Sequence, residues 1–159
     1  MLERIKANLH RQEKGLILLS TLLEEEFTHL TGRDPKAVTG CEFSIQELIK
    51  QLAVERLELR GMVAEIVPGA TSLRDLAEAM DEEESKGFTA FLQFVDTLEQ
   101  KCAVMAEKNS RLAFGLAEQS KNMLDFIHKQ IQPKNEDTYA RNGRYQNHRP
   151  EAAIFRGRS

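Results

Sequence analysis

The side chains best suited to chemistry in this sequence are its histidines, two of which follow closely after a carboxylate. Glu26-Phe27-Thr28-His29 matches the Glu-x-x-His step of carboxylate-bridged di-metal bundles, and Asp125-Phe126-Ile127-His128 has a similar spacing. A di-metal site needs all its ligands to face the interior of the bundle. In the heptad register given below, Asp125 and His128 occupy positions c and f, which point outward. We therefore interpret these residues as solvated side chains on helix surfaces, and we expect no metal site.

The sequence also lacks the usual motifs of nucleophilic catalysis and of phosphate binding. The sequence has no Gly-x-Ser-x-Gly elbow, no glycine-rich phosphate loop and no cysteine paired with a histidine by a known motif. Its two cysteines, Cys41 and Cys102, do not make a disulfide framework, which favours a reducing cytoplasm. We therefore expect no catalytic residues, no cofactor and no enzymatic activity, and we expect the protein to be cytoplasmic.

The composition favours long helices. The chain has 159 residues, of which 30% are charged and only 6% are aromatic, and its formal net charge is −3. Leu, Ala, Glu, Lys and Gln are abundant, whereas a β-sheet core would need more β-branched and aromatic residues. The negative charge argues against general nucleic-acid binding, and no apolar run is long enough to cross a bilayer. We expect an all-α protein that binds no nucleic acid and does not insert into membranes.

The hydrophobic pattern predicts long antiparallel helices that form a coiled-coil-like hairpin or bundle. A first helix is expected over residues 2–30, with Ile17 and Leu18 widening its apolar stripe and Gly32 ending it. Ser44 and Glu47 have the spacing of a capping box, so a second helix is expected over residues 44–66, after a linker that contains Cys41.

A short helix is expected over residues 72–84 and a long one over residues 86–131. The apolar phase of the short helix reaches Gly87, one residue before Phe88, and this slip predicts a break or a kink at residues 85–87. Pro133 ends the long helix, so we expect a helical domain over residues 1–131 and a flexible basic tail over residues 132–159. The tail carries a net charge of +3 and the helical domain −6.

A hydrophobic seam follows the long helix, with apolar residues at the a and d positions of successive heptads. At about 1.5 Å per residue, this helix is about 69 Å long, whereas the first and second are about 44 and 35 Å. Part of the seam must therefore bend back, meet another subunit or receive a ligand. The a positions are Phe88, Val95, Cys102, Asn109, Leu116 and Met123, and the d positions are Phe91, Leu98, Met105, Leu112, Gln119 and Phe126.

Two polar features depart from the apolar pattern. Asn109 occupies an a position, where a buried amide either sets the helix register or is a tolerated polar residue in the core, and both interpretations stay open. Tyr139 lies among turn-forming residues of the tail, either as an exposed anchor for a partner or as a ring that packs back on the bundle.

The order and spacing of three segments are similar to those of the FlgN family of flagellar export chaperones. These segments are Ser44-Ile45-Gln46-Glu47-Leu48-Ile49-Lys50-Gln51-Leu52, Asn109-Ser110-Arg111-Leu112, and Thr138-Tyr139-Ala140-Arg141-Asn142-Gly143. The resemblance implies a chaperone that binds the hook-associated junction proteins of the FlgK and FlgL type, prevents their premature assembly and delivers them to an export gate protein of the FlhA type. It also implies that Tyr139 contributes to docking at that gate.

The rear part of the seam is the expected contact for an amphipathic substrate helix. Methionine suits such a surface because its flexible thioether chain repacks easily. In the alternative interpretation these residues belong to the intramolecular core, or they allow a structural coiled-coil protein to self-associate as a homo-oligomer. The expected substrate-contact residues are Leu112, Leu116, Met123, Phe126 and Ile127.

Overall fold

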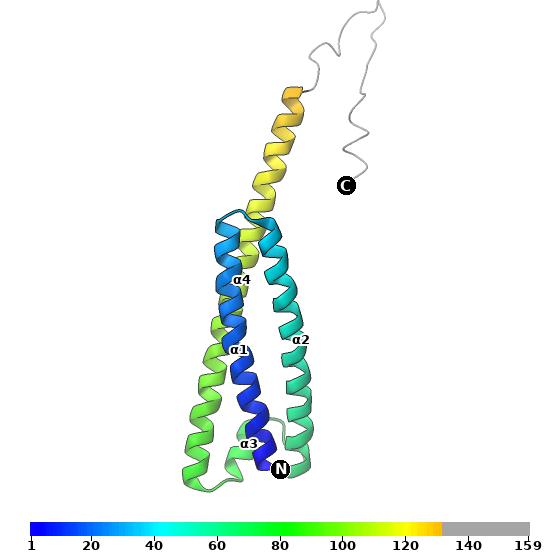
Figure 1. Ribbon diagram of the computed structural model, residues 1–159. Coiled ribbons are helices and arrows are strands. Elements are labelled where there is room, and N and C mark those ends of the chain that lie inside the picture. The colour runs from blue at the N-terminus through cyan, green and yellow to red at the C-terminus, as the bar shows by residue number, and fades with distance from the viewer. Residues whose placement is uncertain (132–159) are drawn as a thin grey trace, which may run out of the picture. The chain divides into compact units, whose positions relative to one another are not determined.

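The computed structural model describes residues 1–131, and within that range the chain is entirely α-helical between its turns. The helices are α1 (Leu2–Thr31), α2 (Pro35–Ile66), α3 (Leu73–Glu78) and α4 (Glu82–Ile131). Figure 1 shows α2 running antiparallel to α1, and α4 running antiparallel to α2. The chain divides into two compact units, Met1–Phe114 and a second one that begins at Gly115, so α4 contributes to both. The all-α prediction is confirmed.

The turn between α1 and α2 is shorter than expected. Gly32 caps α1, and Arg33 adopts a left-handed conformation with φ of 54°, which reverses the chain. Asp34 is the N-cap of α2 because its carboxylate accepts a hydrogen bond from the backbone N–H of Ala37 at 3.1 Å, and Pro35 occupies the first turn.

The predicted start of the second helix at Ser44 was therefore wrong. The Asp34–Pro35 cap starts the helix earlier, and the hydroxyl of Ser44 donates to the carbonyl of Gly40 inside α2 at 3.3 Å. Cys41 is a buried residue of α2, not of a linker, while Phe43 is exposed.

The break before α4 also differs from the prediction. The short helix α3 ends at Glu78 and α4 begins at Glu82, so the break lies at residues 79–81 rather than 85–87. The side chain of Asp81 accepts from the backbone N–H of Glu84 at 2.8 Å, and three glutamates follow in the first turn. Carboxylates are favourable at this positive end of the helix dipole. The capped helix therefore continues through Gly87.

The tightest packing is between α1 and α2. A Cβ atom at Gly15 would lie 2.8 Å from Cδ2 of Leu52, so the absence of a side chain allows the two helices to approach closely. No Cα atom of α4 comes within 8 Å of one in α1 or α2, so α4 packs against these two helices at a greater separation. Gly15 therefore permits the close packing of α1 and α2, a role that the low helix propensity of glycine alone did not indicate.

A buried polar network links α1 to α2. The amide of Asn8 donates to the backbone carbonyl and the carboxylate of Glu55 at 3.0 and 2.8 Å. Arg11 donates twice to the same carboxylate, at 3.0 and 2.9 Å, and this guanidinium holds the pKa of Glu55 below its ordinary value. Gln12 is also buried and donates to Asn8 at 2.6 Å. Every buried polar group of this network has a partner, which is the condition for tolerating it in a core.

The hydrophobic core forms two clusters. The stripe of α1 is narrower than expected, because Ile17 and Leu18 are exposed. One cluster contains Ile5, Leu9, Leu59, Met62, Val63, Leu76, Ala77 and Phe88, and the other contains Leu16, Leu19, Leu23, Ile45, Leu52, Val95 and Cys102.

Candidate functional site

The helical segment at residues 115–131 exposes a set of large apolar side chains. This segment has five exposed large apolar residues, and we call them the apolar arc: Met123, Leu124, Phe126, Ile127 and Ile131. Upstream in α4, the a-position residues Phe88, Val95, Cys102 and Asn109 are all buried. No residue of α4 after Asn109 is buried, so the front of the predicted seam is core and its rear is accessible.

The expected substrate-contact residues differ in exposure. Leu112, in the first unit, and Leu116, in the second, are half-buried. Met123, Phe126 and Ile127 are exposed. Their role in binding stays a prediction.

Sequence reasoning missed two members of the arc. Leu124 and Ile131 fall outside the a and d positions of the heptad register, so a search restricted to those positions passed over them. At about 100° per residue, however, Leu124 and Ile131 lie within about 60° of Ile127. A helical projection of residues 115–131 at 3.6 residues per turn would have found them.

Asn109 lies where α4 meets α1. Its amide donates to the carbonyl of Leu23 at 2.8 Å and to Oε1 of Glu26 at 2.9 Å. One heptad earlier, Sγ of Cys102 donates to the carbonyl of Leu16 at 3.5 Å. The two contacts are separated by seven residues on both helices, so they correspond to one parallel alignment of α1 and α4. Whether Asn109 sets this register stays a prediction.

Glu26 is buried, which corrects its interpretation as a solvated surface residue. Burial, together with a hydrogen bond with Glu42 of α2, raises the pKa of its carboxyl to about 7, against the opposing effect of the amide of Asn109. The same hydrogen bond lowers the pKa of Glu42. Below about pH 7, a protonated Glu26 therefore donates to an ionised Glu42, and with Asn109 these residues connect α1, α2 and α4.

The stability of the bundle is expected to fall as the pH rises through about 7. The pKa of Glu26 is higher in the folded state than in the unfolded chain, so its contribution is present at low pH and is lost above the folded pKa. As the pH rises from 6 to 8, deprotonation of this one carboxyl lowers the free energy of unfolding by about 1 kcal/mol. Urea unfolding across this range measures the effect. Glu26→Gln should remove the pH dependence and the exposed control Glu25→Gln should retain it; an unchanged profile in Glu26→Gln would contradict the assignment.

The residues considered for metal binding do not come together. Within residues 1–131, no three His, Cys, Asp or Glu side chains are arranged to hold a metal ion. Glu26 is engaged with Asn109, His29 and His128 are half-buried, and Asp125 is exposed.

A hollow of about 680 Å³ lies in the first unit, lined by α1, α2, α4 and the segment that leads into α3. It is a poorer candidate than the apolar arc. Several apolar residues that line the hollow, such as Leu9, Leu59 and Val95, are already buried, so a ligand there would remove little apolar surface from water. Arg56 of α2 and Glu99 of α4, both of which line the hollow, form an ion pair.

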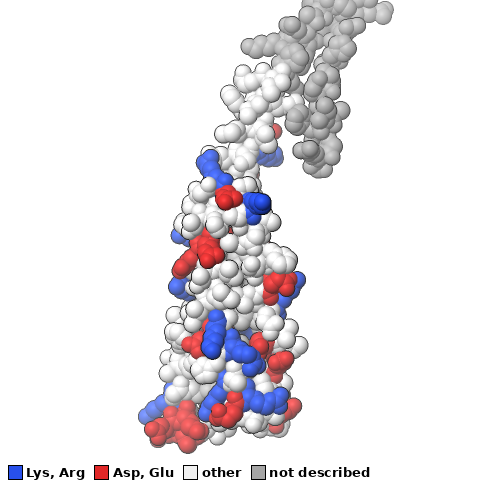
Figure 2. Space-filling model, viewed as in Figure 1, with Lys and Arg blue, Asp and Glu red and all other residues white. Residues whose placement is uncertain are grey.

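On the face of the bundle that is shown, the charged side chains do not indicate an alternative binding site. Figure 2 shows acidic and basic side chains interspersed over the bundle, apart from one acidic group at the lower left, where α4 begins. This group contains Glu82, Glu83 and Glu84. Tyr139, the residue expected to dock at the export gate, lies outside the described residues, and its role stays a prediction.

Several exposed apolar side chains on one helix are typical of proteins that bind helices of a partner. The helical bundle and the apolar arc thus fit the class of helical binding proteins. No described helix is long and apolar enough to span a membrane. The model of the FlgN protein family matches residues 1–147, and the chain therefore belongs to the FlgN family, a family of flagellar export chaperones that is not known for enzymatic activity. Comparisons with curated proteins and with solved structures gave no match.

Proposed function

We propose that this protein is a cytoplasmic export chaperone for the hook-filament junction proteins, of the FlgK and FlgL type. It binds their terminal helices, keeps them from assembling prematurely and delivers them to an export gate protein of the FlhA type. The observation that carries this proposal is the apolar arc, whose side chains are between 44% and 72% exposed. Membership of the FlgN family supports a role in flagellar export in general.

The binding mode follows from the chemistry of the arc. Its residues have aliphatic, aromatic and thioether side chains, which gain free energy when water is removed from them. An amphipathic helix provides a complementary apolar face, and helices that assemble a filament carry such faces before assembly. The chaperone therefore needs no catalytic group, because covering the apolar face of its substrate is sufficient to prevent self-assembly.

Gel filtration of an equimolar mixture tests the proposal. The full chain is mixed separately with each junction protein, and we expect a complex that elutes before either component. A mixture that elutes as two separate proteins, for all junction proteins of the same organism, would argue strongly against this function.

Replacing Tyr139 by alanine is expected to weaken binding to the export gate protein and to leave junction-protein binding largely unchanged. An exposed aromatic ring contributes most of its binding free energy when it enters a partner's pocket, and its loss commonly costs 2 kcal/mol or more, about thirtyfold in Kd. Calorimetric titration against each partner separates the two activities. Tyr139→Phe serves as a control that retains the ring. Loss of both activities in Tyr139→Ala would contradict the proposed division of roles.

A second candidate function is structural self-association, because the same arc is available to a second copy of the chain. Light scattering discriminates between the two. A stable oligomer that dissociates when arc residues are replaced by charged ones would favour the structural coiled-coil protein over the chaperone.

A further inference from the structure

The end of the α1–α2 hairpin that carries the turn is held differently from the rest of the bundle. We define this tip as residues 24–44, and Figure 1 shows its turn between α1 and α2. The two hydrophobic clusters of the described residues include neither of its buried apolar side chains, Leu30 and Cys41. The buried cluster members nearest to the turn are Leu23 in α1 and Ile45 in α2. The tip therefore gains little stabilisation from the core.

A polar contact joins the two helices of the tip instead. Glu26 of α1 is only 6% exposed and shares a hydrogen bond with Glu42 of α2. Two carboxyl groups can form this bond only when one of them is protonated. Gln46 donates to Oε1 of Glu42 at 2.9 Å and favours its ionised form, so the proton lies on Glu26. The contact across the tip thus depends on one proton.

The groups of α1 and α2 beside this pair add no positive charge that could replace the proton. In α1, Glu25 is exposed, and His29 is half-buried one turn after Glu26. In α2, burial and the negative charges of Glu25 and Glu26 raise the pKa of the Cys41 thiol, which keeps the thiol neutral. A second ionised carboxyl at the tip would therefore lie among groups that disfavour it.

The facing part of α4 offers one polar contact, the amide of Asn109, which donates to Oε1 of Glu26 at 2.9 Å. This amide can donate in either protonation state of the carboxyl. The three cations of α4 between residues 101 and 111 are engaged with other groups. Their partners are the ring of Phe27 for Lys108, at 4.2 Å, Glu24 for Lys101, at 3.9 Å, and Glu107 for Arg111, at 2.6 Å.

We infer that the Glu26–Glu42 pair is a proton-dependent clasp: when its proton is lost, the tip opens more readily while the core clusters stay packed. Two adjacent carboxylates repel each other, and a charged Glu26 needs water that its buried position excludes. Parting of the tip admits water and exposes Leu30 and Cys41, whereas parting of the helices elsewhere would expose a core cluster. Local opening at the tip is therefore the least costly response.

The direction of the pH dependence follows from the pKa of Glu26, which is raised to about 7 in the folded chain. A raised pKa stabilises the closed tip at low pH, and this stabilisation is lost as the pH rises through about 7. The clasp is therefore closed in mildly acidic solution and opens more readily in mildly alkaline solution.

Alkylation of Cys41 measures the opening in the full chain. The protein is treated with a maleimide at pH 6 and at pH 8, and the modified cysteines are identified by mass spectrometry. Each rate is divided by that of the urea-unfolded chain at the same pH, which cancels the intrinsic pH dependence of the thiol. We expect this ratio for Cys41 to rise about five- to tenfold from pH 6 to pH 8. An unchanged ratio would overturn the inference.

Cys102 distinguishes local opening from unfolding of the bundle. It is 5% exposed and belongs to a core cluster, so its alkylation requires the core to open. In urea below the unfolding transition, the rate for Cys41 should stay nearly constant because local opening exposes little surface, while the rate for Cys102 should rise steeply. Equal rates with equal urea dependence would show that the tip does not open separately, and the inference would be wrong.

Glutamine variants test the role of the proton. In Glu26→Gln, an amide takes the place of the protonated carboxyl and still donates to Glu42, so the ratio for Cys41 should change less than twofold between pH 6 and pH 8. In Glu42→Gln, the new amide can donate to an ionised Glu26, and the rise should be smaller than in the unmodified chain. A full rise in Glu26→Gln would contradict the clasp, and a full rise in Glu42→Gln would exclude the pair as its basis.

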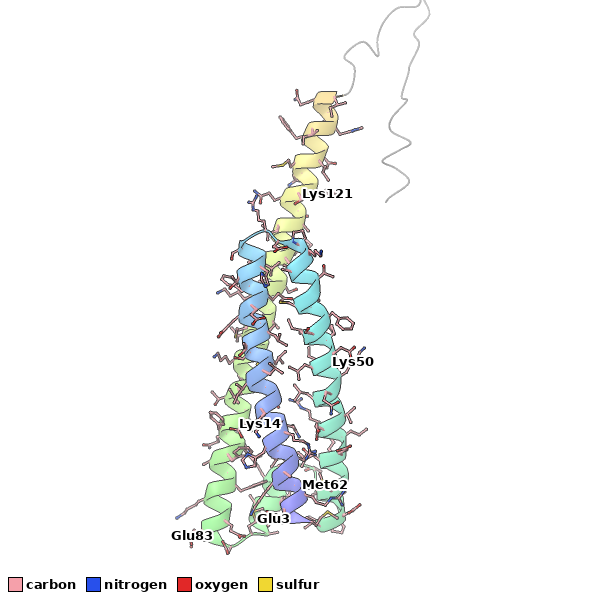
Figure 3. All side chains as sticks on the ribbon, viewed as in Figure 1. Glu3, Lys14, Lys50, Met62, Glu83 and Lys121 are labelled. Carbon is pink, nitrogen blue, oxygen red and sulfur yellow. The ribbon has the colours of Figure 1, made fainter. Side chains whose placement is uncertain are left out.

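Glu47→Gln is the matched control for both variants. It changes the net charge by the same amount, and Glu47 is exposed on α2, five residues after Glu42. Glu47 pairs with Lys50, which Figure 3 shows on the side of α2 that faces away from α1. This variant should retain the full rise for Cys41. Loss of the rise in Glu47→Gln would show that net charge, and not the buried pair, controls the tip.

Discussion

Replacing Met123 and Ile127 together by aspartate is expected to weaken binding of the junction protein at least a hundredfold. Both residues lie in the middle of the apolar arc and are exposed, at 56% and 44%, so they are available to a partner. Burying a large apolar side chain contributes about 1.5–3 kcal/mol, and a carboxylate in its place must be desolvated on binding. Together the two losses exceed about 3 kcal/mol, which corresponds to about a hundredfold in Kd. Calorimetric titration measures this change directly.

The matched control for this variant is the pair Lys121→Gln and Lys129→Gln. It changes the net charge by the same amount on the opposite face of the helix and should change Kd only slightly. Because Met123 and Ile127 are exposed, the aspartate variant should retain its helical circular dichroism, as exposed substitutions usually have small effects on stability. Unchanged affinity in a folded aspartate variant would remove the arc from the binding site.

Replacing Leu16 by alanine is expected to lower the free energy of unfolding by about 2–5 kcal/mol, because the substitution leaves a cavity in a packed core. Leu16 is only 3% exposed and belongs to the cluster that joins α1, α2 and α4. This loss is a large part of the 5–15 kcal/mol that stabilises a typical domain. Urea unfolding followed by circular dichroism measures it.

Leu18 provides the control in the same helix. It is 51% exposed, so Leu18→Ala should change the free energy of unfolding by about 0.5 kcal/mol or less. The two variants remove the same atoms two residues apart in α1, and differ only in burial. Equal losses in both variants would show that the face of α1 assigned to the core is wrong.

The helices were predictable because their signals are local. Apolar spacing in heptads identified the long helix, and the burial of Phe88, Val95 and Cys102 confirms its front part. The helix starts were less predictable, because two capping motifs competed for the second helix. Asp34 with Pro35 caps α2, although Ser44 with Glu47 has an equally good local pattern. The sequence around Ser44 does not reveal that residues 35–43 can pack as helix, with Cys41 in the core.

The candidate site was predictable only in part. Met123, Phe126 and Ile127 followed from the seam, but Leu124 and Ile131 did not, because a heptad register describes only helices that supercoil around each other. The burial of polar residues in the core was even harder to predict from the sequence. Gln12 and Glu26 interrupt the apolar pattern of α1, and their burial depends on partners that are distant in sequence: Asn8 and Glu55 for the first group, and Asn109 and Glu42 for the second.

The sequence by itself determined the all-α class, the long last helix and the resemblance to the FlgN family, because these follow from the periodicity and order of local segments. The tertiary structure alone decided which part of the last helix is covered. Burial requires neighbouring helices, and the neighbours of α4, namely α1 and α2, are far away in sequence. For the same reason, only the fold revealed that Gly15 permits close packing and that the pKa of Glu26 is raised to about 7.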